Sequence, residues 1–146
     1  MYLCLDCLEV YSTPFEHCPK ASCYGRVVEI DELILPAIIE FNKKGYATVF
    51  CCSGHMHSPY PYVVFDINEI PEKQQEIFIN LIPSNWYLSD NIFGYDIHYQ
   101  NKKGEKTAEG EDDMDTYLNL LSANLNLYKF ALQLPDLKEG KINDNN

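Results

Sequence analysis

Four of the six cysteines of this chain lie within its first 23 residues. Cys4 and Cys7 form a C-x2-C pair, and Cys18 and Cys23 form a C-x4-C pair further along. Zinc binds four thiolates tetrahedrally, and short spacings allow one turn to present two sulfurs to the same ion. Because so short a segment cannot bury a core of its own, a metal must supply its folding energy. The sequence therefore predicts a zinc ribbon over residues 1–28, with Zn as its cofactor.

Two alternatives remain open for the metal ligands of this segment, and two for its role. The second pair is wider than the usual two-residue spacing, so one alternative is that His17 replaces one of the cysteine ligands. The other alternative is that the four cysteines are buried and bind no metal. The chain has 22 acidic against 11 basic residues and a formal net charge of -11. An acidic chain repels phosphate backbones, which argues against broad nucleic-acid binding. We therefore favour a structural cap or a protein-contact module over a nucleic-acid reader.

The rest of the chain has the pattern of an α+β domain over residues 29–137. Apolar periodicity and β-branched runs predict helix 33–44, strands 46–51 and 62–67, helix 71–83, strands 86–88 and 93–99, and helix 112–134. Asp31 is the expected N-cap of the first helix. Because short loops join consecutive strands, we expect antiparallel pairs with helices on one face. The predicted fold class is a two-layer α+β sandwich with a mainly antiparallel sheet, followed by a flexible tail over 138–146.

The long last helix carries an apolar stripe with steps of four and three residues. Its members are Met114, Leu118, Leu121, Leu125, Tyr128 and Leu132. Such a stripe can pack on the sheet or on its twin in a dimer. We predict packing on the sheet, with a homodimer or another protein partner as the alternative. Acidic residues at the start of the helix favour an antiparallel arrangement in any dimer.

The loop after the predicted strand 46–51 contains side chains of several chemical kinds. Two thiols, a hydroxyl, a glycine and two imidazoles lie between Cys51 and His57. Gly54 allows a ligand to approach the backbone closely, and the rings of Tyr60 and Tyr62 offer flat apolar surfaces. We predict a site for a small-molecule or nucleotide-like ligand formed by Cys52, Ser53, Gly54, His55, His57, Tyr60 and Tyr62. Two alternatives are a second metal site from Cys52, His55 and His57, and a loop that is merely solvated with Cys51 in the core.

The chain shows no sequence pattern of membrane insertion or export. No apolar run approaches the roughly 20 residues of a spanning helix. Its start lacks a basic head followed by a long apolar stretch. We therefore expect a cytoplasmic protein without a membrane partner.

Residues 30–55, preceded by the cysteine-rich segment, combine an Ile-Asp-Glu helix, a Lys-Gly-Tyr turn and a Cys-Cys-Ser-Gly-His loop. This combination resembles small uncharacterised proteins of bacteria and their phages, and it implies no known activity. Over residues 46–67, the chain also resembles the wybutosine-synthesis methyltransferase family of tRNA modification. That family has a Ser-Cys-Ser-Gly-Arg loop between strands, and His55 stands at the place of its arginine. This second resemblance implies S-adenosylmethionine as a ligand.

Two classes of function follow from these observations. The first is a zinc-stabilised protein with a regulatory or binding role that uses the loop from Cys52 to His55. The alternative is an S-adenosylmethionine-dependent enzyme that modifies a nucleotide or RNA. The sequence offers no acid and base at a spacing typical of catalysis, so it leaves open whether the protein is an enzyme.

Overall fold

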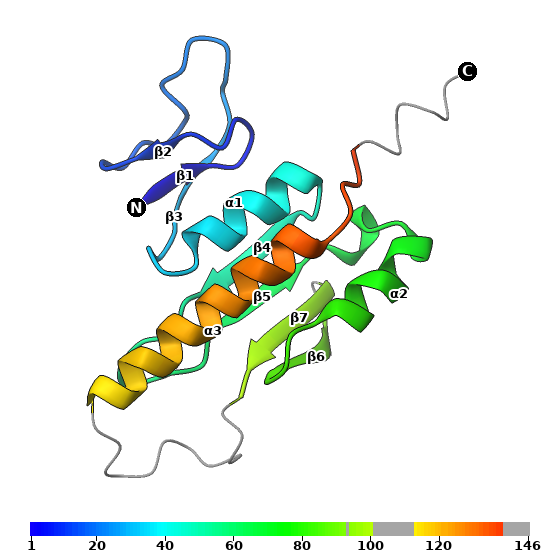
Figure 1. The fold of residues 1–146 in the computed structure, drawn as a ribbon. Helices are drawn as coiled ribbons and strands as arrows, with labels where there is room; N and C mark the ends of the chain where they lie inside the picture. The colour runs from blue at the N-terminus through cyan, green and yellow to red at the C-terminus, as the bar shows by residue number, and fades with distance from the viewer. Residues whose placement is uncertain (93, 101–112, 139–146) are drawn as a thin grey trace.

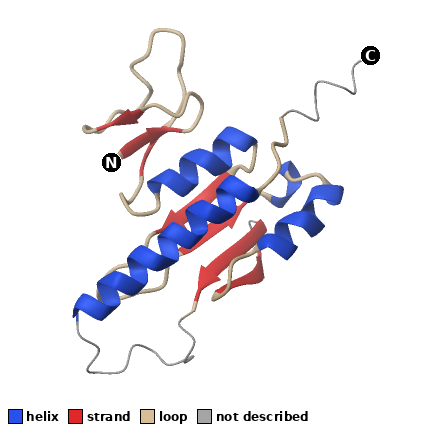
Figure 2. Cartoon of the chain, in the orientation of Figure 1, coloured by secondary structure: helices blue, strands red, loops and turns tan. Residues whose placement is uncertain are grey.

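The computed structural model describes residues 1–92, 94–100 and 113–138. Within these residues the chain is α+β, with two antiparallel sheets and helices packed beside them (Figures 1 and 2). The elements are β1 (Tyr2–Cys4), β2 (Val10–Tyr11), β3 (Val27–Glu29), α1 (Leu35–Lys44), β4 (Thr48–Cys52), β5 (Tyr62–Phe65), the 3-10 helix η1 (Ile67–Glu69), α2 (Glu72–Leu81), β6 (Trp86–Asn91), β7 (Gly94–Tyr99) and α3 (Asp113–Gln133).

The larger sheet has the strand order β4-β5-β7-β6, and every neighbouring pair is antiparallel. A register shift between Thr48 and Phe50 bulges β4 near its start. After the bulge, Cys52 pairs with Tyr62, which pairs in turn with His98 on β7. The predicted α+β class with an antiparallel sheet is confirmed.

The helices cover one face of this sheet (Figure 1). Val63 and Phe65 on β5 and Ile97 on β7 are fully buried on that face. The side chain of Tyr62 points to the opposite face, because successive residues of a strand alternate, and it is 36% exposed. The main core therefore lies on the helix side of the sheet, while the outer face is exposed at Tyr62 and buried at Val64.

The small sheet has the order β2-β1-β3 and is not separate from the core. Leu3 on β1 is fully buried in the same apolar cluster as Ile34, Ile38 and Phe41. The amino terminus of Met1 also donates to the carbonyl of Ile30. The N-terminal segment thus packs onto the larger part of the chain through its first strand.

Asp31 is not the N-cap of α1, contrary to the sequence prediction. The helix begins at Leu35 after Ile34, and Pro36 lies in its first turn, where a missing N–H costs no hydrogen bond. The carboxylate of Asp31 instead accepts two hydrogen bonds from Ser53, 22 residues away. Asp31 therefore makes a tertiary contact with Ser53 and does not cap the helix.

The predicted packing of the long-helix stripe is also wrong for most of its residues, although Tyr128 packs against the core. Leu118, Leu125 and Leu132 are 53%, 52% and 49% exposed. The face of α3 that contacts the body consists of Thr116, Leu120, Ala123, Asn124, Leu127, Phe130 and Ala131. The two faces lie roughly 140° apart around a helix of 3.6 residues per turn. This inner face combines the large Leu127 and Phe130 with small residues, and Phe130 packs against Phe41 of α1.

Beyond Lys138, the predicted tail lies outside the described residues. Among the helices of the described ranges, none combines the length and the apolar character needed to cross a bilayer.

Candidate metal centres and the ligand loop

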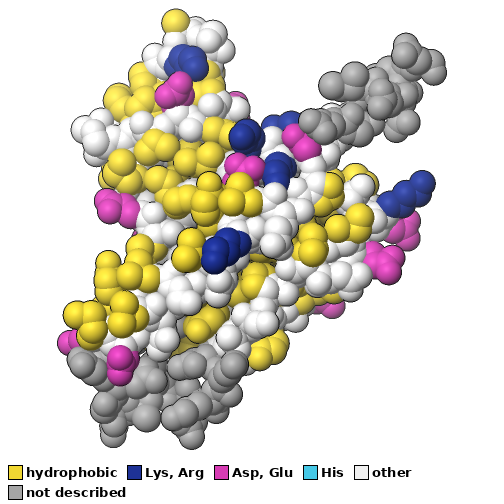
Figure 3. All heavy atoms as spheres, in the orientation of Figure 1, with side chains coloured by type: hydrophobic (Ala, Val, Ile, Leu, Met, Phe, Trp, Pro, Cys, Tyr) yellow, Lys and Arg dark blue, Asp and Glu magenta, His cyan; other side chains and the backbone are white. Residues whose placement is uncertain are grey.

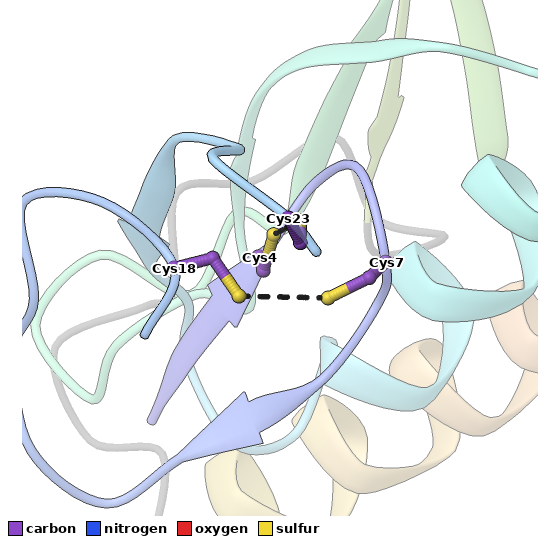
Figure 4. Close-up of side chains that lie close together, drawn as sticks. All are labelled: Cys4, Cys7, Cys18 and Cys23. Carbon is purple, nitrogen blue, oxygen red and sulfur yellow. Dashed lines mark hydrogen bonds between the residues drawn. The ribbon is translucent and has the colours of Figure 1, made fainter. Parts of the chain in front are cut away.

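The four N-terminal thiols meet in one cluster (Figure 4). Cys4 and Cys7 come from the end of β1 and the turn after it, and Cys18 and Cys23 come from the segment between β2 and β3. The sulfurs of Cys4 and Cys23 lie 3.6 Å apart, and so do those of Cys7 and Cys18. All four sulfurs lie within 4.8 Å of one another. A tetrahedral zinc site with Zn–S bonds of about 2.3 Å requires sulfur separations of about 3.8 Å. The cluster therefore has the donor set and the spacing to hold a metal ion.

Tight turns bring the two pairs together. Leu8 has a positive φ of 61°, and its N–H donates to the carbonyl of Cys4. In the second pair, the N–H of Cys23 donates to the carbonyl of Lys20, which closes a turn between the two cysteines. This turn takes up the two extra residues of the C-x4-C spacing. His17, the alternative ligand, is exposed and lies outside the four-thiol cluster.

The protons of the cluster are distributed unequally. A hydrogen bond from the Tyr11 hydroxyl, 3.1 Å from the sulfur, lowers the pKa of Cys18 to about 7. For Cys7, the backbone N–H of Glu9 lowers the pKa, but burial and hydrogen bonds with the three other thiols raise it to about 12. Four neighbouring thiols cannot all ionise without a compensating cation, which a divalent metal provides.

Position 25 requires a glycine because of its close packing against the cysteine cluster, and not because of a positive φ angle. A Cβ at this position would lie 2.7 Å from the Cys4 sulfur and 2.7 Å from the side chain of Asp6. We expect Gly25→Ala to displace the Cys4 sulfur and reduce the metal content of the purified protein at least tenfold, measured by inductively coupled plasma mass spectrometry. The matched control is Ser22→Ala at an exposed position, which should keep the metal. Equal metal content in both variants would contradict the close packing.

A second group of donor side chains forms around the predicted ligand loop. One ligand atom from each of Asp31, Cys52 and His55 lies within 4.8 Å of the other two. The Cys52 sulfur is 3.4 Å from Nε2 of His55, and the N–H of Gly54 donates to the same sulfur at 3.4 Å. Sequence reasoning missed Asp31 because an aspartate before a helix is also the usual N-cap.

Ser53 and Gly54 position this loop. Ser53 is only 4% exposed, and both its N–H and its hydroxyl donate to Oδ2 of Asp31. The side-chain amide of Asn124 on α3 donates to the Ser53 carbonyl at 3.0 Å. Gly54 has a positive φ of 80°, and a Cβ there would lie 2.7 Å from Leu120. The loop is therefore anchored to α3 on its inner side.

The remaining predicted ligand residues are more exposed. His57 is exposed and stands outside the group of Asp31, Cys52 and His55. Tyr60 and Tyr62 are 41% and 36% exposed. Strand pairing places Tyr62 between Cys52 and His98 on the outer face of the sheet, a neighbourhood that the sequence alone did not reveal.

Cys51 belongs to the other face of β4. It packs against the core, and burial raises the pKa of its thiol to about 12. A hollow of about 320 Å³ lies beside it, between β3 and β4 rather than at the loop. The structure thus separates a packing cysteine from its donor neighbour Cys52.

No family model, curated protein or solved structure matches this chain. The two family resemblances noted from the sequence therefore stay predictions.

Proposed function

We propose that this chain is a zinc-stabilised binding protein whose loop from Cys52 to His55 captures a small-molecule or nucleotide-like ligand. The ribbon supplies the structural zinc site through Cys4, Cys7, Cys18 and Cys23. The spacing of their sulfurs supports zinc, since it is close to that of a tetrahedral thiolate site.

One observation carries the binding role: Asp31, Cys52 and His55 converge at the end of β4, an edge strand of the larger sheet. Three different donors at one point can recognise a polar group, and the adjoining ring of Tyr62 offers a flat wall for a base or another aromatic group. The loop is held from behind by Asn124, so its donor groups are preorganised rather than mobile.

The loop can be tested by equilibrium dialysis against a panel of nucleosides, nucleotides, amino acids and S-adenosylmethionine, read by mass spectrometry. We expect the wild-type chain to enrich at least one compound and His55→Ala to lose at least nine-tenths of that enrichment. His17→Ala is the matched control, because this histidine is also exposed but lies in the ribbon. Failure to enrich any compound, or equal enrichment by His55→Ala, would contradict a ligand site at the loop. Selective retention of S-adenosylmethionine would favour the enzyme alternative.

A further inference from the structure

We propose that Asp31, Cys52 and His55 bind a second transition-metal ion and leave one coordination position open toward the outer face of the sheet. This inference rests on the proposed function, since it names the group through which the loop would capture its ligand. It replaces the set of Cys52, His55 and His57 that the sequence offered as a metal site.

The geometry fits a metal of zinc type. Bonds of about 2.3 Å to sulfur and about 2.0 Å to nitrogen at a tetrahedral angle place those atoms roughly 3.5 Å apart. The observed separation between the Cys52 sulfur and Nε2 of His55 is 3.4 Å. The carboxylate of Asp31 completes the group within 4.8 Å. A thiolate and a carboxylate together balance the charge of a divalent ion.

The three side chains are also held as metal ligands usually are, by contacts behind them. Ser53 donates twice to Oδ2 of Asp31, which leaves Oδ1 for a metal. The N–H of Gly54 supports the Cys52 sulfur. The backbone of His55 forms two hydrogen bonds with Ser58, at 3.0 and 2.9 Å, which fix the turn that carries its ring.

The donor set decides the class of metal and ligand. Sulfur, nitrogen and oxygen together suit zinc or a similar borderline ion better than calcium or magnesium, which prefer oxygen alone. Three protein ligands leave a fourth position for water or a ligand atom, as in sites where a metal binds small molecules. The ligand class is then a small molecule with a carboxylate, thiol or imidazole donor and a flat group to lie against Tyr62.

Metal counting tests the second site on the full-length chain. After zinc saturation and removal of excess metal, we expect two zinc ions per wild-type chain and one in Cys52→Ser and in His55→Ala. His57→Ala should keep two. Ser53→Ala, which removes one support of Asp31, should weaken the second site by roughly 10–100-fold. One zinc ion in the wild type, or two in both Cys52→Ser and His55→Ala, would overturn the proposal.

The same samples separate this inference from the proposed function. Suppose that the wild type binds one zinc ion and enriches a compound that His55→Ala does not enrich. That result would overturn only the second metal site. Two zinc ions with no enriched compound would overturn only the ligand-binding role. Circular dichroism of His55→Ala should match the wild type, because this side chain is exposed.

A different observation, the outward face of α3, carries a second inference: we propose that two copies of this chain dock through α3 in antiparallel orientation. Leu118, Leu125 and Leu132 are each about half exposed on this face, and Tyr117 beside them is 46% exposed. Figure 3 has the orientation of Figure 1, and hydrophobic side chains gather at its lower left, where α3 begins. The three leucines, together with Leu121 and Tyr128, repeat in steps of three and four residues, which is the spacing of a coiled-coil seam.

The order of these residues favours a second copy as the occupant. Residues 118 and 128, and residues 121 and 125, are equidistant from residue 123. An antiparallel pair centred there places each apolar residue against another across the two-fold axis. Asp115 and Lys129 are exposed on the same flank of the seam, near opposite ends. Antiparallel docking sets Asp115 against the partner's Lys129, whereas parallel docking places these flanks on opposite sides of the interface, where the two residues cannot pair.

Sedimentation equilibrium of the full-length chain tests this interface. At about 100 μM, where a complex of micromolar affinity is assembled, we expect the wild type to be a dimer. Leu125→Glu should raise the dissociation constant at least tenfold without loss of helix by circular dichroism, since this leucine is half exposed. Asp115→Lys and Lys129→Asp should each weaken the dimer, and the double variant should restore it. A monomeric wild type, or a double variant no better than the single ones, would overturn the proposal.

Discussion

Replacing Cys4 by serine should remove the metal from the ribbon and unfold its small sheet. Structural zinc sites of this kind contribute about 10–16 kcal/mol in zinc-finger peptides, far more than a three-stranded sheet of two- and three-residue strands can supply otherwise. The Cys4 sulfur is fully buried among the other thiols, so serine can neither ligate well nor escape to solvent. We expect metal content to fall at least tenfold and amide hydrogens of residues 2–29 to exchange rapidly.

The effect should reach the rest of the chain in a graded way. Leu3 leaves the common core when the ribbon unfolds, and exposing a buried leucine costs about 1.5–3 kcal/mol. We therefore expect the amide hydrogens of residues 35–81 to keep exchanging slowly in Cys4→Ser. The melting temperature of this part of the chain should be lower than in the wild type. Cys51→Ala is the control, because it removes a thiol outside the cluster and should leave the ribbon metal in place. A Cys4→Ser chain with unchanged exchange in the ribbon would show that metal does not hold this segment.

Features set by near neighbours in the chain were the ones predicted from sequence. The cysteine pairs depend on turns of a few residues, and the pairs β4-β5 and β6-β7 depend on short connections between consecutive strands. The loop was also recognisable, because Cys52 and His55 are three residues apart and come together through one turn. These features need no knowledge of the tertiary fold.

Features set by distant contacts were missed for definite reasons. Asp31 lies 21 residues before Cys52 and joins it only because the strand β4 returns past the start of α1. On α3, the sequence prediction selected the stripe from Met114 to Leu132, but the inner face combines large residues such as Phe130 with small ones and with the polar Asn124. Asn124 is buried although it is polar, because its side-chain amide donates to the carbonyls of Ser53 in the loop and of Leu120. A hydropathy pattern cannot distinguish such a face from a solvated one.

Among single substitutions, we expect Phe78→Ala at the centre of the core to cause the largest loss of stability. The Phe78 side chain of α2 is fully buried. Its ring lies 5.0–6.2 Å, between centroids, from the rings of Phe65, Phe130, Tyr46 and Tyr95. Truncation of a buried phenylalanine to alanine removes this area and leaves a cavity, which costs about 3–5 kcal/mol. That is a large part of the 5–15 kcal/mol that stabilises a typical domain.

The neighbouring residue provides the matched control for this substitution. Ile79 follows Phe78 on the same helix but is 41% exposed, so Ile79→Ala should change the free energy of unfolding by less than about 1 kcal/mol. Urea unfolding of the zinc-loaded chain, followed by tryptophan fluorescence of the buried Trp86, measures both variants. A loss of less than about 1 kcal/mol in Phe78→Ala would mean that the cluster can collapse around the missing ring. Equal losses in the two variants would instead indicate that the helix matters more than the ring, because both substitutions change α2 while only one opens the core.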